Sequence, residues 1–213
     1  MSHMNQKHDG RRNKVGLDDG GEMCEQDFGS GILASVATEK DIDDITNFLR
    51  LFGFPRSDSK TANEVPFYAN PALPFGAYSE TEVRSHLFHY TAAFFMLRKN
   101  GMLSALLIFR FPLPQFSNKS VMMDLILSVY GGRTDPSFLS ELMNFACNCL
   151  PRISIVECTK VKGLVLKDSL ECNTMCEWFT KNGFVKESIL SDEFGPKKDV
   201  VIFSRWLAPH THT

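Results

Sequence analysis

The chain has 213 residues, 43% of them hydrophobic, and a formal net charge of -2 at pH 7. This length suits one domain with a substantial core, and the composition excludes wholesale disorder. Without a broad excess of positive charge, nucleic acid is not expected as a partner. No stretch reaches the roughly 18–20 apolar residues of a membrane helix, and the N-terminus lacks a hydrophobic signal core. We therefore expect a soluble, cytoplasmic protein with no membrane partner.

The six cysteines contain no CxxC pair, and no histidine follows them at zinc-ligand spacing. We predict free thiols in a reducing compartment, most of them buried. Cys172 and Cys176 lie four residues apart on one face of a predicted helix, where packing is favoured over redox chemistry. His86 and His89 supply at most half of a metal site, so the sequence predicts no metal.

The N-terminal third begins with residues 1–30, which show no apolar period and are predicted to be a flexible tail. A domain is expected over 31–207, followed by a short flexible tail, 208–213. Its first elements are a strand at 32–36 and a helix that Thr38 caps, with Asp41 in its first turn.

The middle of the chain gives the sharpest local signal. Asn100-Gly101 separates two apolar runs, 93–97 and 103–109, and this dipeptide favours a tight hairpin turn. A moderate helical pattern covers 80–90. Before it, the segment 56–79 is too long for a simple connection and is predicted to be a functional loop.

The C-terminal half alternates between strands and helices. The predicted elements are a strand at 121–129, a helix from Asp135-Pro136 to Pro151, a strand at 153–158, a helix at 173–181 that Asn173 caps, and strands at 184–190 and 200–206. The hairpin requires antiparallel neighbours, whereas strand–helix–strand units favour parallel ones. The sequence thus predicts an α+β (α/β) fold with a mixed central β-sheet of about six to seven strands flanked by helices.

This order of elements resembles the GCN5-related N-acetyltransferase (GNAT) superfamily over residues 31–207. The segment Asn173-x-x-Cys176-x-Trp178-Phe179-x-Lys181-x-Gly183-Phe184 is similar to the family's N-x-x-A-x-x-[YF]-x-K-x-G-F segment. The strand-to-helix turn at 37–45 is also similar, although that pattern is common. The resemblance implies a GNAT-like fold.

The resemblance also implies a function: an N-acyltransferase that moves an acyl group from acetyl-CoA, or another acyl-CoA, to an amine by direct attack. The acceptor is expected to be an amine-bearing small molecule or protein. Family positions map the thioester and CoA contacts onto Leu127, Ser128, Val129, Gly131, Gly132, Arg133, Asn173 and Phe179.

Acetyl transfer also needs a base to take the proton of the amine. Asp124, on the predicted strand 121–129, and Glu157, on the predicted strand 153–158, are the candidate catalytic residues. The alternative is that both carboxylates lie at strand ends in solvent. For Phe179 and Trp178 the alternative is a role as core aromatics.

Two departures from the family pattern keep other functions open. The family's phosphate loop, Q/R-x-x-G-x-G/A, corresponds here to a stretch with different glycine spacing, in which Asp135 and Pro136 replace an anion-binding helix start. Phe179 stands where the family often has a proton-donating tyrosine. The alternatives are an acyltransferase with a carrier-protein donor and a catalytically inactive, antizyme-like module that binds a protein partner.

Overall fold

The computed structural model describes residues 24–51, 68–69, 78–112, 119–128, 136–154, 157–167, 172–193 and 196–207. Within them, one mixed sheet has the strand order β1-β2-β4-β5-β6-β7-β9-β8, and β3 pairs with β6. The strands are β1 (Glu25–Gly29), β2 (Ile32–Val36), β3 (Tyr68–Ala69), β4 (Ala92–Lys99), β5 (Met102–Arg110), β6 (Ser120–Ser128), β7 (Lys160–Leu166), β8 (Val185–Leu190) and β9 (Val200–Trp206). The mixed α/β architecture is confirmed, with nine strands in place of six to seven.

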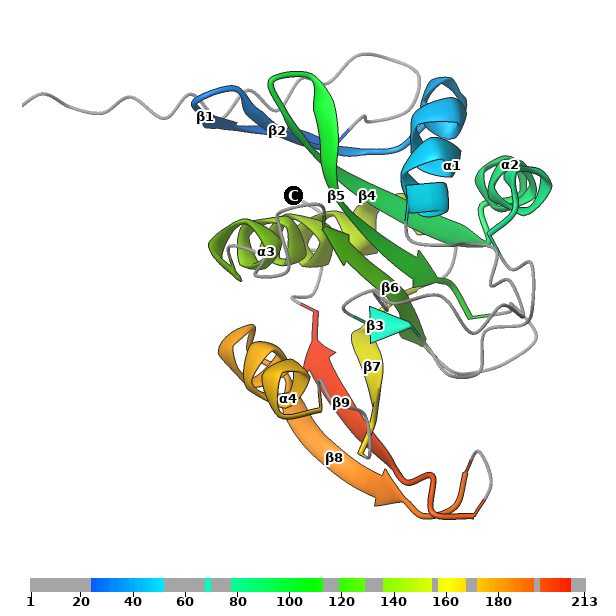
Figure 1. Ribbon diagram of the computed structural model, residues 1–213, viewed down its shortest axis with the longest axis vertical. Coiled ribbons are helices and arrows are strands. Elements are labelled where there is room, and N and C mark those ends of the chain that lie inside the picture. Colours follow the sequence, from blue (N-terminus) through cyan, green and yellow to red (C-terminus); the bar gives the residue numbers. More distant parts are fainter. Residues whose placement is uncertain are drawn as a thin grey trace, which may run out of the picture.

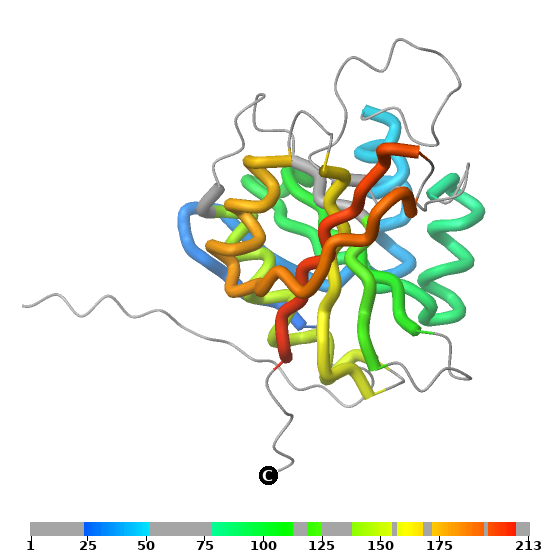
Figure 2. Tube along the Cα trace, turned by 90° about the horizontal axis from the view of Figure 1, so that it is seen from below, coloured from blue at the N-terminus to red at the C-terminus, as the bar shows by residue number. Residues whose placement is uncertain are grey.

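Helices cover both faces of the sheet. They are a 3₁₀ turn, η1 (Glu39–Asp41), followed by α1 (Ile42–Leu51), α2 (Glu80–His89), α3 (Pro136–Ile153) and α4 (Cys172–Lys181). Figures 1 and 2 show α1 and α2 on one side of the sheet and α4 on the other, and Figure 1 places α3 beside α4. Strand side chains alternate between the two faces, so Phe95 and Leu107 pack in the α3–α4 core while Phe94 and Ile108 pack in the α1–α2 core.

The predicted hairpin is confirmed. β4 and β5 pair antiparallel from Lys99↔Met102 outwards. Asn100 and Gly101 both have positive φ angles, 51° and 83°, as a type I′ turn requires.

Two predicted boundaries are wrong. β1 lies inside the segment that was predicted to be a flexible tail, so the sheet begins before residue 31. Its residues are exposed or half-buried because it is an edge strand held by backbone pairing to β2, and such a strand leaves little hydrophobic signal. The second wrong boundary is the start of α4. This helix begins at Cys172, so Asn173 is inside the helix and does not cap it.

The strand predicted at 153–158 is also wrong. α3 continues through Pro151 to Ile153, and the next strand, β7, begins at Lys160. Proline is tolerated here because only one backbone donor is lost near the end of a long helix. β7 buries Val161, Gly163 and Val165 and leaves alternate residues half-buried, a period-two pattern that a lysine-rich sequence with a central glycine disguises.

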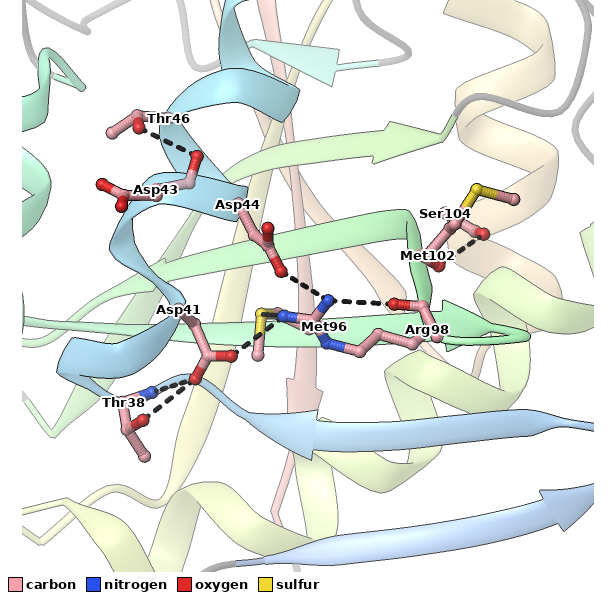
Figure 3. A network of polar contacts seen from close by, with 10 residues as sticks. Thr38, Asp41, Asp43, Asp44, Thr46, Met96, Arg98, Met102 and Ser104 are labelled. Carbon is pink, nitrogen blue, oxygen red and sulfur yellow. Dashed lines mark hydrogen bonds and ion pairs between the residues drawn. The ribbon is translucent and has the colours of Figure 1, made fainter.

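An arginine ties the first helix to the sheet (Figure 3). Arg98 on β4 donates to the carboxylates of Asp41, at 2.9 Å, and Asp44, at 2.6 Å. Asp41, which was predicted in the first turn, also accepts from the backbone N–H and the hydroxyl of Thr38. The Arg98 side chain is only 16% exposed, so the two carboxylates compensate a positive charge that water largely does not reach.

Replacing Arg98 with methionine should lower the free energy of unfolding by about 2 kcal/mol, because it leaves hydrogen bonds to two half-shielded carboxylates unmade. Urea unfolding measures the loss. The matched control is Arg50→Met on α1, whose ion pair with Glu80 is exposed and 3.7 Å long, and which should cost less than about 0.5 kcal/mol. Equal losses in the two variants would contradict the assignment of a structural role to Arg98.

Candidate functional site: the fork between β6 and β7

The only parallel pair among the described strands is β6 with β7, and it is short. Ser120, Val121 and Met122 pair with Lys160, Val161 and Lys162. Beyond these pairs β6 runs on to Ser128, and β7 runs on to Leu166 paired with β9 on its other side. We call this divergence the β6–β7 fork.

A bulge in β6 lies where the strands part. Phe109 of β5 pairs with Met123, while the preceding residue of β5, Ile108, pairs with Leu125. Asp124 is therefore the extra residue of the bulge and has no partner on β5. A bulge bends its strand and increases its twist, which accounts for β6 turning away from β7 at this point.

The far part of the fork is occupied by the chain itself. Leu125 and Ile126 pair with β5 on one edge, so their pairing with Ala69 and Tyr68 of β3 uses the opposite edge, which faced β7 before the fork. β3 thus takes the edge of β6 that β7 has left. Farther along β6, Leu127 and Ser128 are in register with Leu106 and Ala105 of β5.

Asp124 is at the centre of a buried polar cluster. Its side chain is 0% exposed and accepts hydrogen bonds from Nε and Nη2 of Arg110, both at 2.8 Å, and from the Tyr78 hydroxyl at 2.5 Å. The alternative prediction, that Asp124 is a solvated carboxylate, is wrong. Sequence reasoning missed Tyr78 and Arg110; the one available signal was an arginine that directly follows a long apolar strand.

The environment of Tyr78 keeps its phenol protonated. Burial raises the pKa of Tyr78 well above its usual value, and the negative charge of Asp124 raises it further. Tyr78 therefore acts as the hydrogen-bond donor and Asp124 as the acceptor. His86 of α2 lies beside Tyr78, with ring centroids 5.8 Å apart, and its Nδ1 is 2.8 Å from the hydroxyl of Thr91. Titratable groups from α2, β5 and β6 thus meet at the fork.

The second predicted base is elsewhere. Glu157 precedes β7, is 67% exposed and forms an ion pair with Lys119, which precedes β6. Both residues lie at the closed end of the fork, where Thr159 donates its backbone N–H to the carbonyl of Lys119. The structure does not bring Asp124 and Glu157 together, and the solvated reading predicted as the alternative describes Glu157.

Phe179 lies in the core, as its alternative prediction held. It is 0% exposed and packs between Phe184 and Phe203. The tip of its ring faces β7, where a Cβ on Gly163 would meet the Phe179 Cζ at 2.4 Å. A tyrosine at 179 would place its hydroxyl against this strand. The family's proton donor therefore has no room at this position.

The remaining predicted contacts divide into two groups. Asn173 is exposed in the first turn of α4. Val129, Gly131, Gly132 and Arg133 lie outside the described residues, so their roles stay predictions. In the described part of the chain no group of three or more His, Cys, Asp or Glu side chains is arranged to hold a metal ion. The same residues include no helix long and apolar enough to cross a membrane.

Solved structures share this architecture, although no protein-family model and no characterised protein matches the sequence. A GNAT-family acetyltransferase from Desulfovibrio desulfuricans is similar at 12% identity and a TM-score of 0.60, covering 83% of this chain and 99% of its own. An acetyltransferase from Staphylococcus epidermidis is 10% identical with a TM-score of 0.58, and the match covers 83% of this chain and 99% of that one. A variant of the spermidine N-acetyltransferase from Vibrio cholerae is 16% identical with a TM-score of 0.56, and the match covers 84% of this chain and 95% of that one. The protein therefore has the GNAT fold.

Proposed function

We propose that this protein is an N-acyltransferase that transfers an acyl group from a thioester, with acetyl-CoA as the expected donor, to an amine by direct attack. The observation that carries the proposal is the β6–β7 fork, with its bulge at Asp124, on a GNAT fold. The amine nitrogen attacks the thioester carbonyl, the carbon–sulfur bond breaks, and the thiolate takes up a proton. Backbone N–H groups near the end of β6, around Leu127 and Ser128, would stabilise the oxyanion.

Asp124 is the proposed proton acceptor. It is the one of the two predicted bases that lies at the fork, where Arg110 forms an ion pair with it. Hydrogen bonds from Arg110 and Tyr78 hold the Asp124 carboxylate in one orientation, so the amine has to bind next to it. The acceptor class is an amine; one structural neighbour is a spermidine acetyltransferase and another acetylates an alanine of a ribosomal protein.

Binding and transfer are tested separately. Acetyl-CoA at a hundred times its Kd should stabilise the protein by about 2.7 kcal/mol, seen as a rise in Tm. Thiol release in the presence of polyamines or peptide N-termini should fall by roughly 100-fold in Asp124→Asn, since proton transfer contributes about that much. Glu157→Gln is the matched control and should leave the rate unchanged. An absent Tm shift at millimolar acetyl-CoA, or equal losses in both variants, argues against the proposal.

A second candidate function is supported by β3. A non-catalytic protein-binding module needs no thioester slot, and here the backbone of Tyr68 and Ala69 pairs with the edge of β6 inside the fork. Replacing both residues with proline removes their backbone donors. If acetyl-CoA binds more tightly to the proline variant, β3 competes with the donor and the transferase proposal stands. If neither form binds acetyl-CoA while the intact protein captures a stoichiometric protein partner, the binding module is favoured.

A further inference from the structure

Two cysteines and an arginine meet far from the fork. Cys24 lies directly before β1, and its carbonyl oxygen accepts from the Val36 N–H at 3.1 Å, which fixes it beside the end of β2. Arg152, in the last turn of α3, donates from Nη2 to the Cys24 sulfur at 3.0 Å. Cys149 lies one turn earlier on the same helix and is hydrogen-bonded to Cys24. The two thiols therefore come from distant parts of the sequence and are in contact.

The two sulfurs have different surroundings. Nη2 of Arg152 lies 3.0 Å from the Cys24 sulfur, and a neighbouring guanidinium is typical of nucleophilic cysteines. The hydrogen bond to Cys24, followed by burial, raises the pKa of Cys149 well above its usual value, so Cys149 remains a thiol. Both side chains are buried, at 4% and 2% exposure, while Arg152, which contacts Cys24, is exposed.

We propose that Cys24 and Cys149 are a redox pair that a hydroperoxide converts into a disulfide joining the start of β1 to α3. The Cys24 thiolate attacks the peroxide, the oxygen–oxygen bond breaks, and Cys24 becomes a sulfenic acid while hydroxide or alkoxide leaves. The Cys149 thiol then attacks this sulfur, the disulfide forms, and water leaves. The two thiols are oxidised by two electrons and the hydroperoxide is reduced. This site is independent of the proposed acyl transfer.

The other cysteines provide matched controls. Cys172 and Cys176 are also in contact, with sulfurs 3.9 Å apart on α4, and burial raises the pKa of Cys176 to about 11. Cys147, on α3 beside Met143, has its pKa raised to about 11 by burial. Because burial raises the pKa of Cys147 and of Cys176, these two thiols should react more slowly than Cys24.

The test uses the full chain in its folded state. The reduced protein is treated with hydrogen peroxide, blocked with N-ethylmaleimide, digested without reductant and examined by mass spectrometry. We expect a cross-linked peptide pair containing Cys24 and Cys149 that dithiothreitol reverses, and a Tm higher by roughly 5 °C, because the cross-link restricts the unfolded chain. Cys24→Ser and Cys149→Ser should each lack the cross-link, whereas Cys172→Ser and Cys176→Ser should retain it.

Arg152 is a positioning residue in this scheme, and its variants separate charge from packing. Arg152→Gln should slow cross-linking by about tenfold, and Arg152→Lys, which keeps the positive charge, should restore most of the rate. Equal rates in all three proteins, oxidation confined to Cys172 and Cys176, or absence of the cross-link in the unmodified protein would each overturn the proposal. The last result requires no variant, so it holds even if a substitution impairs folding.

Discussion

Replacing Arg110 with methionine should lower the free energy of unfolding by about 3–5 kcal/mol, because it leaves the Asp124 carboxylate buried without a counter-charge. Asp124 is 0% exposed, and Arg110 supplies two of its three hydrogen bonds from protein donors described above. Chemical denaturation with urea measures the loss.

Two further variants test the cause. Adding Asp124→Leu to Arg110→Met removes the unpaired charge and should recover much of the lost stability, although it abolishes the proposed proton acceptor. Arg84→Met is the surface control: its ion pair with Glu80 is exposed on both sides, at 59% and 49%, and its loss should be nearly silent. A cost below about 1 kcal/mol for Arg110→Met would show that Asp124 has other compensation.

The second large effect is expected where α4 meets β7. Gly163→Ala should cost about 1–3 kcal/mol, because its new Cβ would lie 2.4 and 2.6 Å from two ring atoms of Phe179. The Phe179 ring has no space to move away, because it stacks on Phe203, with ring centroids 5.1 Å apart, and contacts Phe184, with ring centroids 4.9 Å apart. Thermal and urea unfolding of the variant provide the measurement.

A second substitution at Phe179 tests whether the loss of stability in Gly163→Ala comes from this clash or from a general destabilisation of β7. Phe179→Leu removes the ring tip, so the double variant with Gly163→Ala should be more stable than the sum of the two single losses predicts. Phe179→Tyr should be destabilised by a similar amount and should gain no transferase activity, because its hydroxyl points into the strand. A stable, more active Phe179→Tyr protein would show that the family's proton donor can be accommodated after all.

Local patterns predicted most of the elements. The Asn100-Gly101 turn, the helix start at Thr38 and the C-terminal strands could be predicted because turn torsions and side-chain periods are properties of short segments. The same reasoning failed at β1, which has no apolar face, and at β7, where Ile153, the first residue of the predicted strand, belongs to the end of α3. Both failures concern segments whose state depends on neighbours distant in sequence.

The candidate site was predicted only in part. Asp124 was identified as a carboxylate on the relevant strand, but its partners Arg110 and Tyr78 were not, since nothing local links residues on a strand and before a helix to a bulge. Glu157 was placed on a strand that does not exist, which put it at the fork instead of at its closed end.

The sequence by itself determined where most of the strands and helices form, that the sheet is mixed and that the order of elements resembles that of the GNAT fold. Only the tertiary structure decided that β6 bulges and leaves β7, that β3 takes the vacated edge, and that Cys24 meets Cys149. The physical reason is the sequence separation of the residues that set each property. Backbone torsions and hydrophobic periods are set within a few residues, whereas strand register and burial of charge are settled by the packing of segments a hundred residues apart.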